Sequence, residues 1–274
     1  MRKMADSGYI HGTSAEEQSR LARLNALLNR ASLEALGLAG GERILDVGSG
    51  LGQLTRAMGK ATGRCVIGVE RSADQRETAE RLAAEGGEKD FAEFRAGDAE
   101  ALPLARSEWG TFDLVHARFV LEHVADPLAV VRQMTRAVRP GGRIVLEDDD
   151  HSMMRLWPTP EGFSAVWSAY MASYEKIGGD PIVGRRLVAL LAEAGAHPRR
   201  NRLLFFGSCA GAADFPLYTE NLSIILEQAR GLIVDGGLLD AERFDRARAA
   251  YREWADRPDA AIWYVRNWAE GLRR

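Results

Sequence analysis

A glycine-rich turn followed by a distant glutamate supplies residues suited to binding a nucleoside. Gly48, Gly50 and Gly52 follow the short apolar run 44–47 of the 274-residue chain. Because glycine tolerates positive φ and has no side chain, the backbone of this turn can approach a ligand closely. Glu70 stands 22 positions after Gly48. In nucleotide-binding α/β folds, an acid roughly 20 residues beyond such a turn accepts hydrogen bonds from ribose hydroxyls.

A strand, a turn and a helix are needed to position these residues. Residues 44–47 have the apolar character of a strand covered on both faces, and residues 51–58 have helical spacing. The amide groups of the incoming helix should then face a ligand above the turn. Taken alone, the turn could also be a tight strand-to-helix connection with no ligand.

The alternation of strand and helix continues along the chain. The Ser-x-x-Glu spacing at 14–17 predicts a helix that starts there and ends at Gly37. Segments with strand character follow, separated by helical patterns, at 65–70, 91–96, 112–118, 143–146, 200–208 and 261–268. Strands that alternate with helices predict an α/β fold.

Several motifs resemble those of the class I S-adenosylmethionine-dependent methyltransferases. The turn at 46–52 has the order Asp-x-Gly-x-Gly-x-Gly, which differs from the Gly-x-Gly-x-x-Gly of dinucleotide enzymes. Gly-Asp-Ala-x-x-Leu-Pro at 97–103, the segment 112–127 and Arg-Pro-Gly-Gly at 139–142 follow in the family's order. The resemblance covers residues 43–148. It implies a Rossmann-like, seven-stranded, mostly parallel sheet with an antiparallel last strand and helices on both faces.

The resemblance also implies a binding site for S-adenosyl-L-methionine, with S-adenosyl-L-homocysteine as product. Asp98 would accept from the adenine amino group, although an aspartate here could instead satisfy its own turn. His116 and Ala117 would lie near the sulfur. The expected cofactor-binding residues are Tyr9, Asp46, Gly48, Ser49, Gly50, Gln53, Glu70, Arg71, Gln75, Gly97, Asp98, Ala99, His116 and Ala117.

Two helical additions to the sheet are expected. The Tyr-Ile-His-Gly run at 9–12 resembles the arm of a bacterial subgroup in which such arms cover bound cofactor, so residues 1–40 are predicted to form an arm and a lid helix. A solvated arm is the alternative. Residues 41–274 would form the methyltransferase domain, with helical segments at about 152–195 and 211–257 roofing the substrate. The second segment, an insertion before the last strand, could instead pair subunits in a homodimer.

Histidines and acids near the predicted substrate edge are candidates for catalysis. His123 and His151 could act as general bases, although a lone histidine is more often structural. The acidic run 147–150 suggests a metal, but the position at the end of strand four, 116–118, has no acid. We therefore expect no metal, and a solvated or substrate-facing acidic loop.

Composition narrows the classes of partner. Hydrophobic residues make up 46% of the chain, charged residues 27%, and the formal net charge is -3. The absence of a long basic run argues against a dedicated nucleic-acid binder, and no segment is apolar enough to span a bilayer. The N-terminus lacks a secretory apolar core, so a cytoplasmic location is expected. Cys65 and Cys209 are predicted to be packing residues.

These patterns favour a methyltransferase that moves a methyl group from S-adenosylmethionine to an oxygen, nitrogen or carbon atom of a small molecule. A nicotinamide-dependent oxidoreductase would share the strand, turn and ribose acid, but the glycine spacing and the Gly-Asp-Ala motif oppose it. A non-catalytic S-adenosylmethionine-binding protein is the third alternative, because no catalytic residue is evident.

Overall fold

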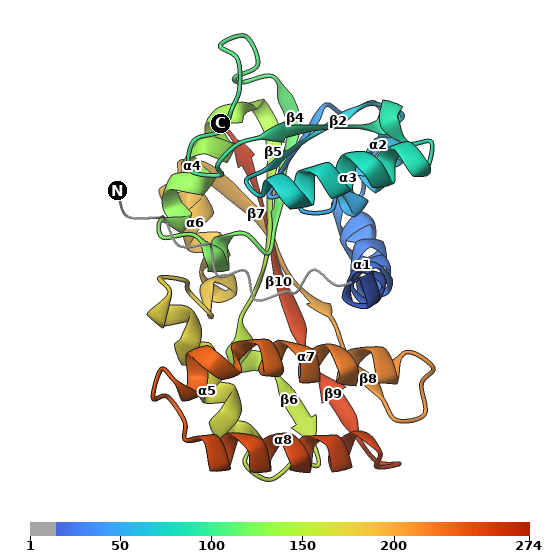
Figure 1. Ribbon diagram of the computed structural model, residues 1–274. Coiled ribbons are helices and arrows are strands. Elements are labelled where there is room, and N and C mark those ends of the chain that lie inside the picture. The colour runs from blue at the N-terminus through green and yellow to red at the C-terminus, as the bar shows by residue number, and fades with distance from the viewer. Residues whose placement is uncertain (1–14) are drawn as a thin grey trace, which may run out of the picture. The chain divides into compact units, whose positions relative to one another are not determined.

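The computed structural model describes residues 15–274, with side chains from residue 25 onward. The described chain divides into two compact units (Figure 1). The sheet unit contains Asn25–Asp150, Ile182–Leu204 and Val265–Arg274. The helical unit contains, of the described residues, 15–24, His151–Pro181 and Phe205–Tyr264.

The sheet unit is built on a seven-stranded sheet in the order β3-β2-β1-β4-β5-β10-β7. Its strands are β1 (Ile44–Val47), β2 (Val66–Glu70), β3 (Ala92–Ala96), β4 (Phe112–Arg118), β5 (Val138–Asp149), β7 (Ala196–Phe205) and β10 (Val265–Arg273). Strands β1 to β5 pair in parallel, and β10 pairs antiparallel with β5. The predicted mostly parallel sheet with an antiparallel last strand is confirmed.

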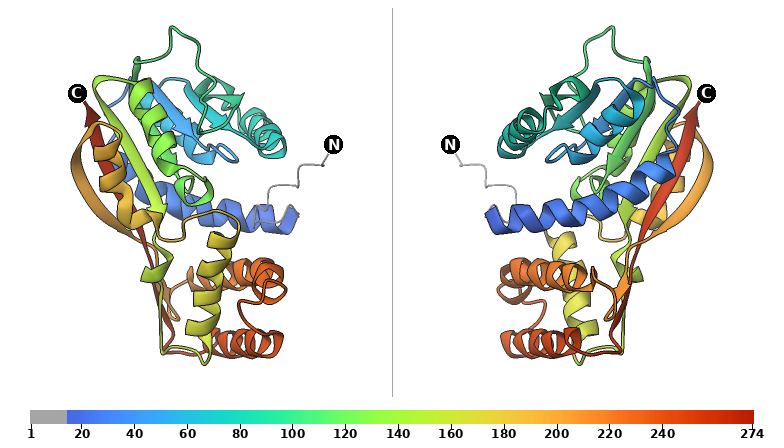
Figure 2. Two further views of the ribbon diagram at one scale, coloured as in Figure 1. Left: turned by 90° about the vertical axis from the view of Figure 1, so that its left-hand side faces the viewer. Right: turned by 90° about the vertical axis from the view of Figure 1, so that its right-hand side faces the viewer.

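Helices cover both faces of this sheet (Figure 2). They are α1 (Ala15–Leu36), α2 (Gln53–Thr62), α3 (Ala73–Glu85), α4 (Pro127–Ala137) and α6 (Leu187–Glu193), with 3-10 turns η1 (Lys89–Phe91), η2 (Leu121–His123) and η4 (Val183–Arg186). One face packs an apolar core against α4 and α6. The other face packs against the end of α1 and against α2. The two packed faces bury the apolar strands as their sequences predict.

Side-chain caps fix where the helices begin. The hydroxyl of Ser72 accepts from the amide of Gln75 at 3.4 Å at the start of α3. Asp126 accepts from the amide of Ala129 at 3.0 Å before Pro127, the first residue of α4. Proline is favoured at this position because the first helical N–H lacks an intrahelical partner.

The helical unit has a core of its own. Three helices, α5 (Phe163–Lys176), α7 (Phe215–Val234) and α8 (Ala241–Ala255), accompany a small antiparallel sheet of β6 (Arg155–Trp157), β9 (Ala261–Trp263) and β8 (Ser208–Cys209). The 3-10 turn η3 (His151–Met153) opens the unit. Rings stack in its interior, with Trp167 on Tyr170 at 4.8 Å between centroids and Tyr251 on Trp254 at 5.4 Å.

Three predictions, two about strands and one about the cysteines, were wrong. The predicted strand 261–268 is two strands, β9 and β10, which belong to different sheets, and the predicted strand 200–208 is divided between β7 and β8. Cys65 and Cys209 are exposed, not packed. Cys65 precedes the first residue of β2, and Cys209 lies on an edge strand, so neither is covered by neighbouring strands on both sides.

Within the described residues, no helix is both long and apolar enough to cross a membrane.

Candidate functional site

The predicted glycine turn has the backbone that its sequence requires. Gly48, Gly50 and Gly52 have φ of 72°, 54° and 69°. A Cβ at Gly48 would lie 2.3 Å from a methyl of Val120, and one at Gly52 would lie 2.2 Å from the ring of Phe94. Both conformation and space therefore demand glycine at these two positions.

Most amides of the turn are already used by the protein. The carbonyl of Val69 accepts from the amides of Gly48 and Ser49, at 2.8 and 3.0 Å. The amide of Gly50 donates to Glu70 at 2.9 Å, and that of Gly52 to the Ser49 carbonyl at 2.9 Å. The contribution of the turn to binding is therefore its shape, which lets a ligand approach the backbone closely. Free main-chain donors must come from the first turn of α2, which begins at Gln53.

Glu70 is held at the carboxyl end of β2. Its Oε1 accepts from the amide of Ser72 at 2.8 Å and its Oε2 from the amide of Gly50 at 2.9 Å. A carboxylate has about four acceptor positions, so two such bonds leave capacity for two hydroxyl donors. The side chain is only half-buried. This arrangement suits the predicted contact with a ribose.

The Gly-Asp-Ala segment lies next to this acid. Gly97 donates to the carbonyl of Glu70 at 3.3 Å, and a Cβ at Gly97 would lie 2.5 Å from the ring of Pro103. Oδ1 of the exposed Asp98 accepts from the amide of Glu100 at 2.8 Å. The turn role foreseen as an alternative is therefore present, and it is compatible with a ligand contact through Oδ2.

Asp46 and His116 form a buried pair between β1 and β4. Nδ1 of His116 lies 2.9 Å from Oδ1 of Asp46, and Oδ2 accepts from the Thr55 hydroxyl at 2.6 Å. Asp46 is therefore engaged within the protein. Nε2 of His116 is buried and has no hydrogen-bond partner among the described residues. Buried polar atoms normally have one, so this nitrogen fits a ligand group that a bound cofactor would bring.

The remaining predicted cofactor residues vary in exposure. Arg71 is exposed, whereas Ala117 is buried beneath the turn. Oε1 of Gln75 lies 3.5 Å from the position of a Cβ at Gly50, so it borders the turn. Ser49 packs its hydroxyl against Gly68, 2.8 Å from the position of a Cβ there, which directs this side chain back toward the sheet. Ala99 lies half-buried next to Asp98. Tyr9 and His11 fall outside the described residues.

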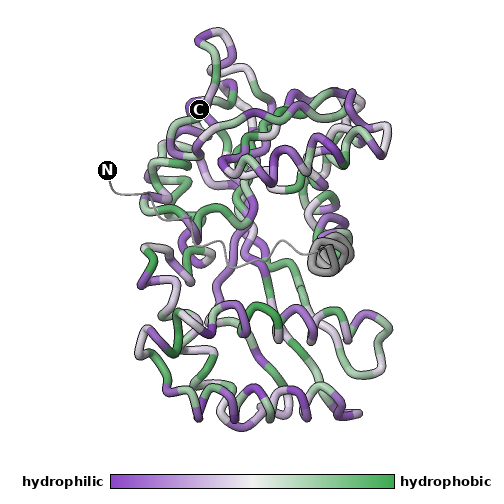
Figure 3. Tube along the Cα trace, viewed as in Figure 1, coloured by the Kyte–Doolittle hydropathy of each residue, from purple (hydrophilic) through white to green (hydrophobic). Residues whose placement is uncertain are grey.

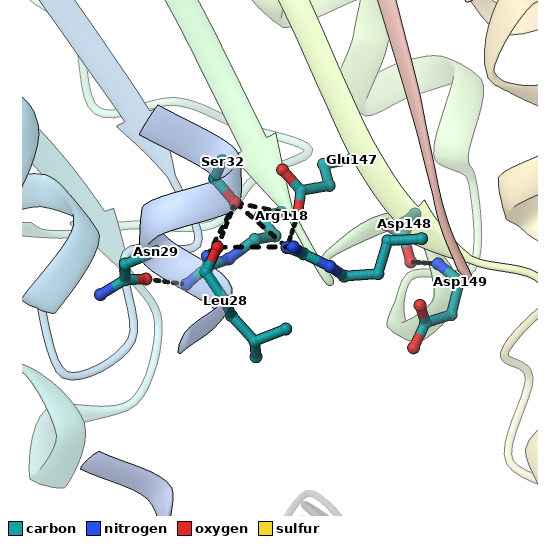
Figure 4. Close-up of polar contacts among 8 residues, drawn as sticks. Leu28, Asn29, Ser32, Arg118, Glu147, Asp148 and Asp149 are labelled. Atoms are coloured by element: carbon teal, nitrogen blue, oxygen red, sulfur yellow. Dashed lines mark hydrogen bonds and ion pairs between the residues drawn. The ribbon is translucent and has the colours of Figure 1, made fainter. Parts of the chain in front are cut away.

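A buried ion network lies at the carboxyl ends of β4 and β5 (Figure 4). Glu147 accepts from the hydroxyl of Ser32 at 3.0 Å and pairs with Arg266. Arg118 donates to Ser32 at 3.1 Å and to Asn29 at 2.8 Å. Sequence analysis did not identify Asn29, Ser32 or Arg266. The signal was available as period-2 alternation, which places His116 with Arg118 and Arg266 with Trp268 on single faces of their strands.

Of the two alternatives for the acidic loop, the solvated one is wrong, and the substrate-facing one stays a prediction. Figure 3 shows the run 147–150 as a hydrophilic stretch, yet all four side chains are buried. Asp148 accepts from the amides of Val120 and Leu121, at 3.1 and 2.8 Å. Asp150 binds Arg185 through both oxygens, at 2.7 and 3.0 Å. Residues distant in the sequence therefore supply the partners that water would otherwise supply.

Burial raises the pKa values of two acids, Glu122 near this run and Asp148 within it. It raises the pKa of the Glu122 carboxyl to about 8. Burial, together with the charges of Glu122 and Asp149, raises the pKa of Asp148 well above its ordinary value. Both shifts follow from the cost of ionising a carboxyl group away from water.

The two candidate bases lie in different units and different surroundings. His123 of the sheet unit is exposed, with Nε2 3.4 Å from Glu122. His151 of the helical unit is buried, and its Nδ1 lies 2.9 Å from the Tyr264 hydroxyl. Rings surround it, Tyr174 at 5.1 Å and Tyr170 at 5.5 Å between centroids.

Comparison with known proteins identifies the family to which the chain is similar. A methyltransferase domain family matches residues 15–207. The chain is 34% identical over 155 residues to 27-O-demethylrifamycin SV methyltransferase of Amycolatopsis mediterranei, covering 57% of this chain and 54% of that protein. It is 40% identical over 113 residues to a ubiquinone biosynthesis O-methyltransferase of Methylococcus capsulatus, covering 41% and 46%. The chain spans about half the length of the curated relatives it matches first.

A solved structure with the same fold is geranyl diphosphate C-methyltransferase of Streptomyces coelicolor, in complex with Mg2+, geranyl diphosphate and S-adenosyl-L-homocysteine. The TM-score is 0.56 at 18% sequence identity, covering 97% of this chain and 87% of that one. At this identity the likeness concerns the fold alone. Since the family match spans most of the described chain and the glycine turn, strand order and Glu70 agree with it, the chain belongs to the methyltransferase domain family.

Proposed function

We propose that this protein binds S-adenosyl-L-methionine at the edge formed by β1, β2 and β4 and transfers its methyl group to a small molecule. The observation that carries the proposal is the carboxylate of Glu70, which two backbone amides hold beside a turn that only glycine can form. The orphaned Nε2 of His116 supports it, and so does the family.

The chain's own contribution is positional. Bound S-adenosylmethionine supplies an already activated methyl group, so no covalent residue is required. Glu70 would hold the ribose and Asp98 the adenine, while Asp46 fixes the ring of His116 through Nδ1. A fixed ligand and the exclusion of water favour an in-line approach of the acceptor.

The acceptor is proposed to be a small molecule whose reacting atom is oxygen, nitrogen or carbon. The relatives named above act on a rifamycin and in ubiquinone biosynthesis, which supports this class without choosing within it. If the acceptor needs a base, His123 and His151 stay the candidates. A cytoplasmic location, a homodimer and the lid and roof roles of the helical segments also stay predictions.

Calorimetric titration with S-adenosyl-L-homocysteine and its 2′-deoxy and 3′-deoxy forms tests the proposal. Removing a hydroxyl should weaken binding to wild type by about 10-fold or more, because each bond is made to a charged group. In Glu70→Gln the same deletion should cost little. Glu77→Gln, an exposed glutamate on α3, serves as the control and should behave as wild type.

Each alternative predicts a different outcome. A folded wild type that binds NADH and not S-adenosyl-L-homocysteine would favour a nicotinamide-dependent oxidoreductase. Equal weakening of all three ligands by Glu70→Gln would mean that Glu70 only supports the turn. Tight binding with no S-adenosyl-L-homocysteine formed across a broad acceptor panel would favour a non-catalytic binding protein.

A further inference from the structure

Two arginines and one glutamate lie near Ser32 at the carboxyl ends of β4 and β5. Arg266 pairs with Glu147 and also donates to the carbonyl of Leu28 at 3.4 Å. Arg118 donates to the neutral oxygens of Ser32 and Asn29. Of the two guanidinium groups, that of Arg266 therefore forms the ion pair with the carboxylate.

Arg118 has a charge without a local counter-ion. Within the described part of the chain, no carboxylate oxygen lies within 4.0 Å of its guanidinium nitrogens. Burial lowers the pKa of Arg118, and the nearby charge of Arg266 lowers it further, while the more distant carboxylates of Glu147 and Asp46 raise it without contacting the guanidinium. A desolvated cation is costly unless an anion pairs with it. The site is therefore electrostatically incomplete.

The position of Arg118 places this charge at the ligand edge. It is the last residue of β4, and the preceding Ala117 pairs with Val47, so Arg118 is level with the first glycine of the turn. In open parallel sheets ligands bind beyond the carboxyl ends of the strands. The side chain is only partly buried, so a ligand can reach it.

The surrounding backbone and side chains fix the guanidinium in place. Asn29 and Ser32, both buried on α1, hold its two terminal nitrogens. The next residue, Phe119, has φ of 56°, and its amide donates to the carbonyl of Glu147 at 3.0 Å. It is the sole non-glycine residue with positive φ in the described range. Such strain persists where surrounding contacts impose it, often at binding sites.

We propose that Arg118 binds a ligand carboxylate at the glycine turn. The carboxylate could belong to the amino-acid end of S-adenosylmethionine or to the methyl acceptor, and the planar guanidinium suits either. If the carboxylate is that of S-adenosylmethionine, the inference rests on the proposed function. It makes Arg118 the residue that orients the ligand's charged end, a role separate from the ribose contact of Glu70.

The test compares ligands that differ by one carboxylate. Wild type, Arg118→Gln and Arg118→Lys are titrated with S-adenosyl-L-homocysteine and with S-adenosyl-3-thiopropylamine, the same molecule without the carboxylate. Wild type should lose about 10- to 100-fold in affinity with the second ligand. Arg118→Gln should bind both within about 3-fold, and Arg118→Lys should fall between. Arg132→Gln, an exposed arginine on α4, is the matched control.

A second arm tests the acceptor as the source. If wild type does not discriminate between the two adenosyl ligands, benzoate titrated onto the S-adenosyl-L-homocysteine complex should bind wild type and not Arg118→Gln. Absence of a carboxylate effect in both arms overturns the inference, as does equal weakening of both ligands by Arg118→Gln. The titrations of wild type and Glu70→Gln with the deoxy ligands do not depend on Arg118. Failure of the Arg118 proposal is therefore distinguishable from failure of the proposed function.

Discussion

The two faces of the central strands β1, β4 and β5 differ in chemistry over the same few residues. On one face, Leu45, Val115 and Leu146 pack against an apolar core that includes α4 and α6. The next residue of each strand points to the other face, and these residues, Asp46, His116 and Glu147, are buried as well. Both faces are shielded from water. The buried ion pair of Glu147 with Arg266 lies on the second face, whereas Asp148, beyond Leu146 on the first face, accepts from backbone amides.

The apolar face shows what folding alone requires of these strands. A sheet covered by helices is stabilised by burying apolar area, and ionised groups in the same place carry a desolvation cost. The charged face begins in the same way, with Ile44, Leu114 and Val145 in an apolar cluster. Charge appears only beyond them, beside the glycine turn. This contrast suggests that the charged residues are kept for a ligand and not for stability.

The largest expected effect comes from unbalancing the charged face. Arg266→Met leaves the buried Glu147 without its ion-pair partner. We expect a loss of about 3–5 kcal/mol in the free energy of unfolding, because one buried charge is then uncompensated. Urea unfolding measures it. The double variant Arg266→Met/Glu147→Leu should recover about half of this loss, since neither member of that ion pair then remains.

An equally unstable double variant would contradict this account. It would mean that packing around Arg266, and not its charge, stabilises this face. The contrast between the two faces would then lose its energetic basis.

A cavity on the apolar face should have a smaller effect and a different signature. Leu146 is fully buried and pairs in register with Ala117. Leu146→Ala should cost about 3 kcal/mol through lost transfer energy and the remaining cavity. Affinity for S-adenosyl-L-homocysteine should nevertheless stay within about 2-fold of wild type, because this face is not expected to contact the ligand. Calorimetry well below the unfolding midpoint checks this, and a 10-fold weaker affinity would break the separation of the faces.

The same contrast explains which features the sequence could predict. The glycine turn depends on residues close together in the chain, so a local pattern predicted it. Burial of the acidic run depends on Ser32, 115 residues before Glu147, and on Arg266, 119 residues after it. No local pattern contains those pairings. The split of the predicted last strand at Tyr264 was missed for the same reason, since β9 and β10 differ only in their distant partners.

The last expected effect concerns the acid at the edge of the apolar face, and it shrinks as the pH falls. Burial raises the pKa of Glu122 from its ordinary value of 4.5 to about 8, so the folded protein binds this proton more tightly than the unfolded chain does. The stability that Glu122 contributes is therefore complete below about pH 4.5 and is lost as the pH rises toward 8.

Glu122→Gln keeps the shape and removes the ionisation. The variant should come closest to wild type near pH 5 and exceed it in free energy of unfolding by about 3 kcal/mol at pH 8, because each unit of pKa shift corresponds to about 1.4 kcal/mol. Urea unfolding at unit pH steps measures the difference, with Glu77→Gln as the exposed control. A difference between wild type and Glu122→Gln that stays constant from pH 5 to 8 would mean that the carboxyl ionises freely in the folded protein. In that case water or a cation reaches this edge of the sheet, and the apolar face ends before Glu122.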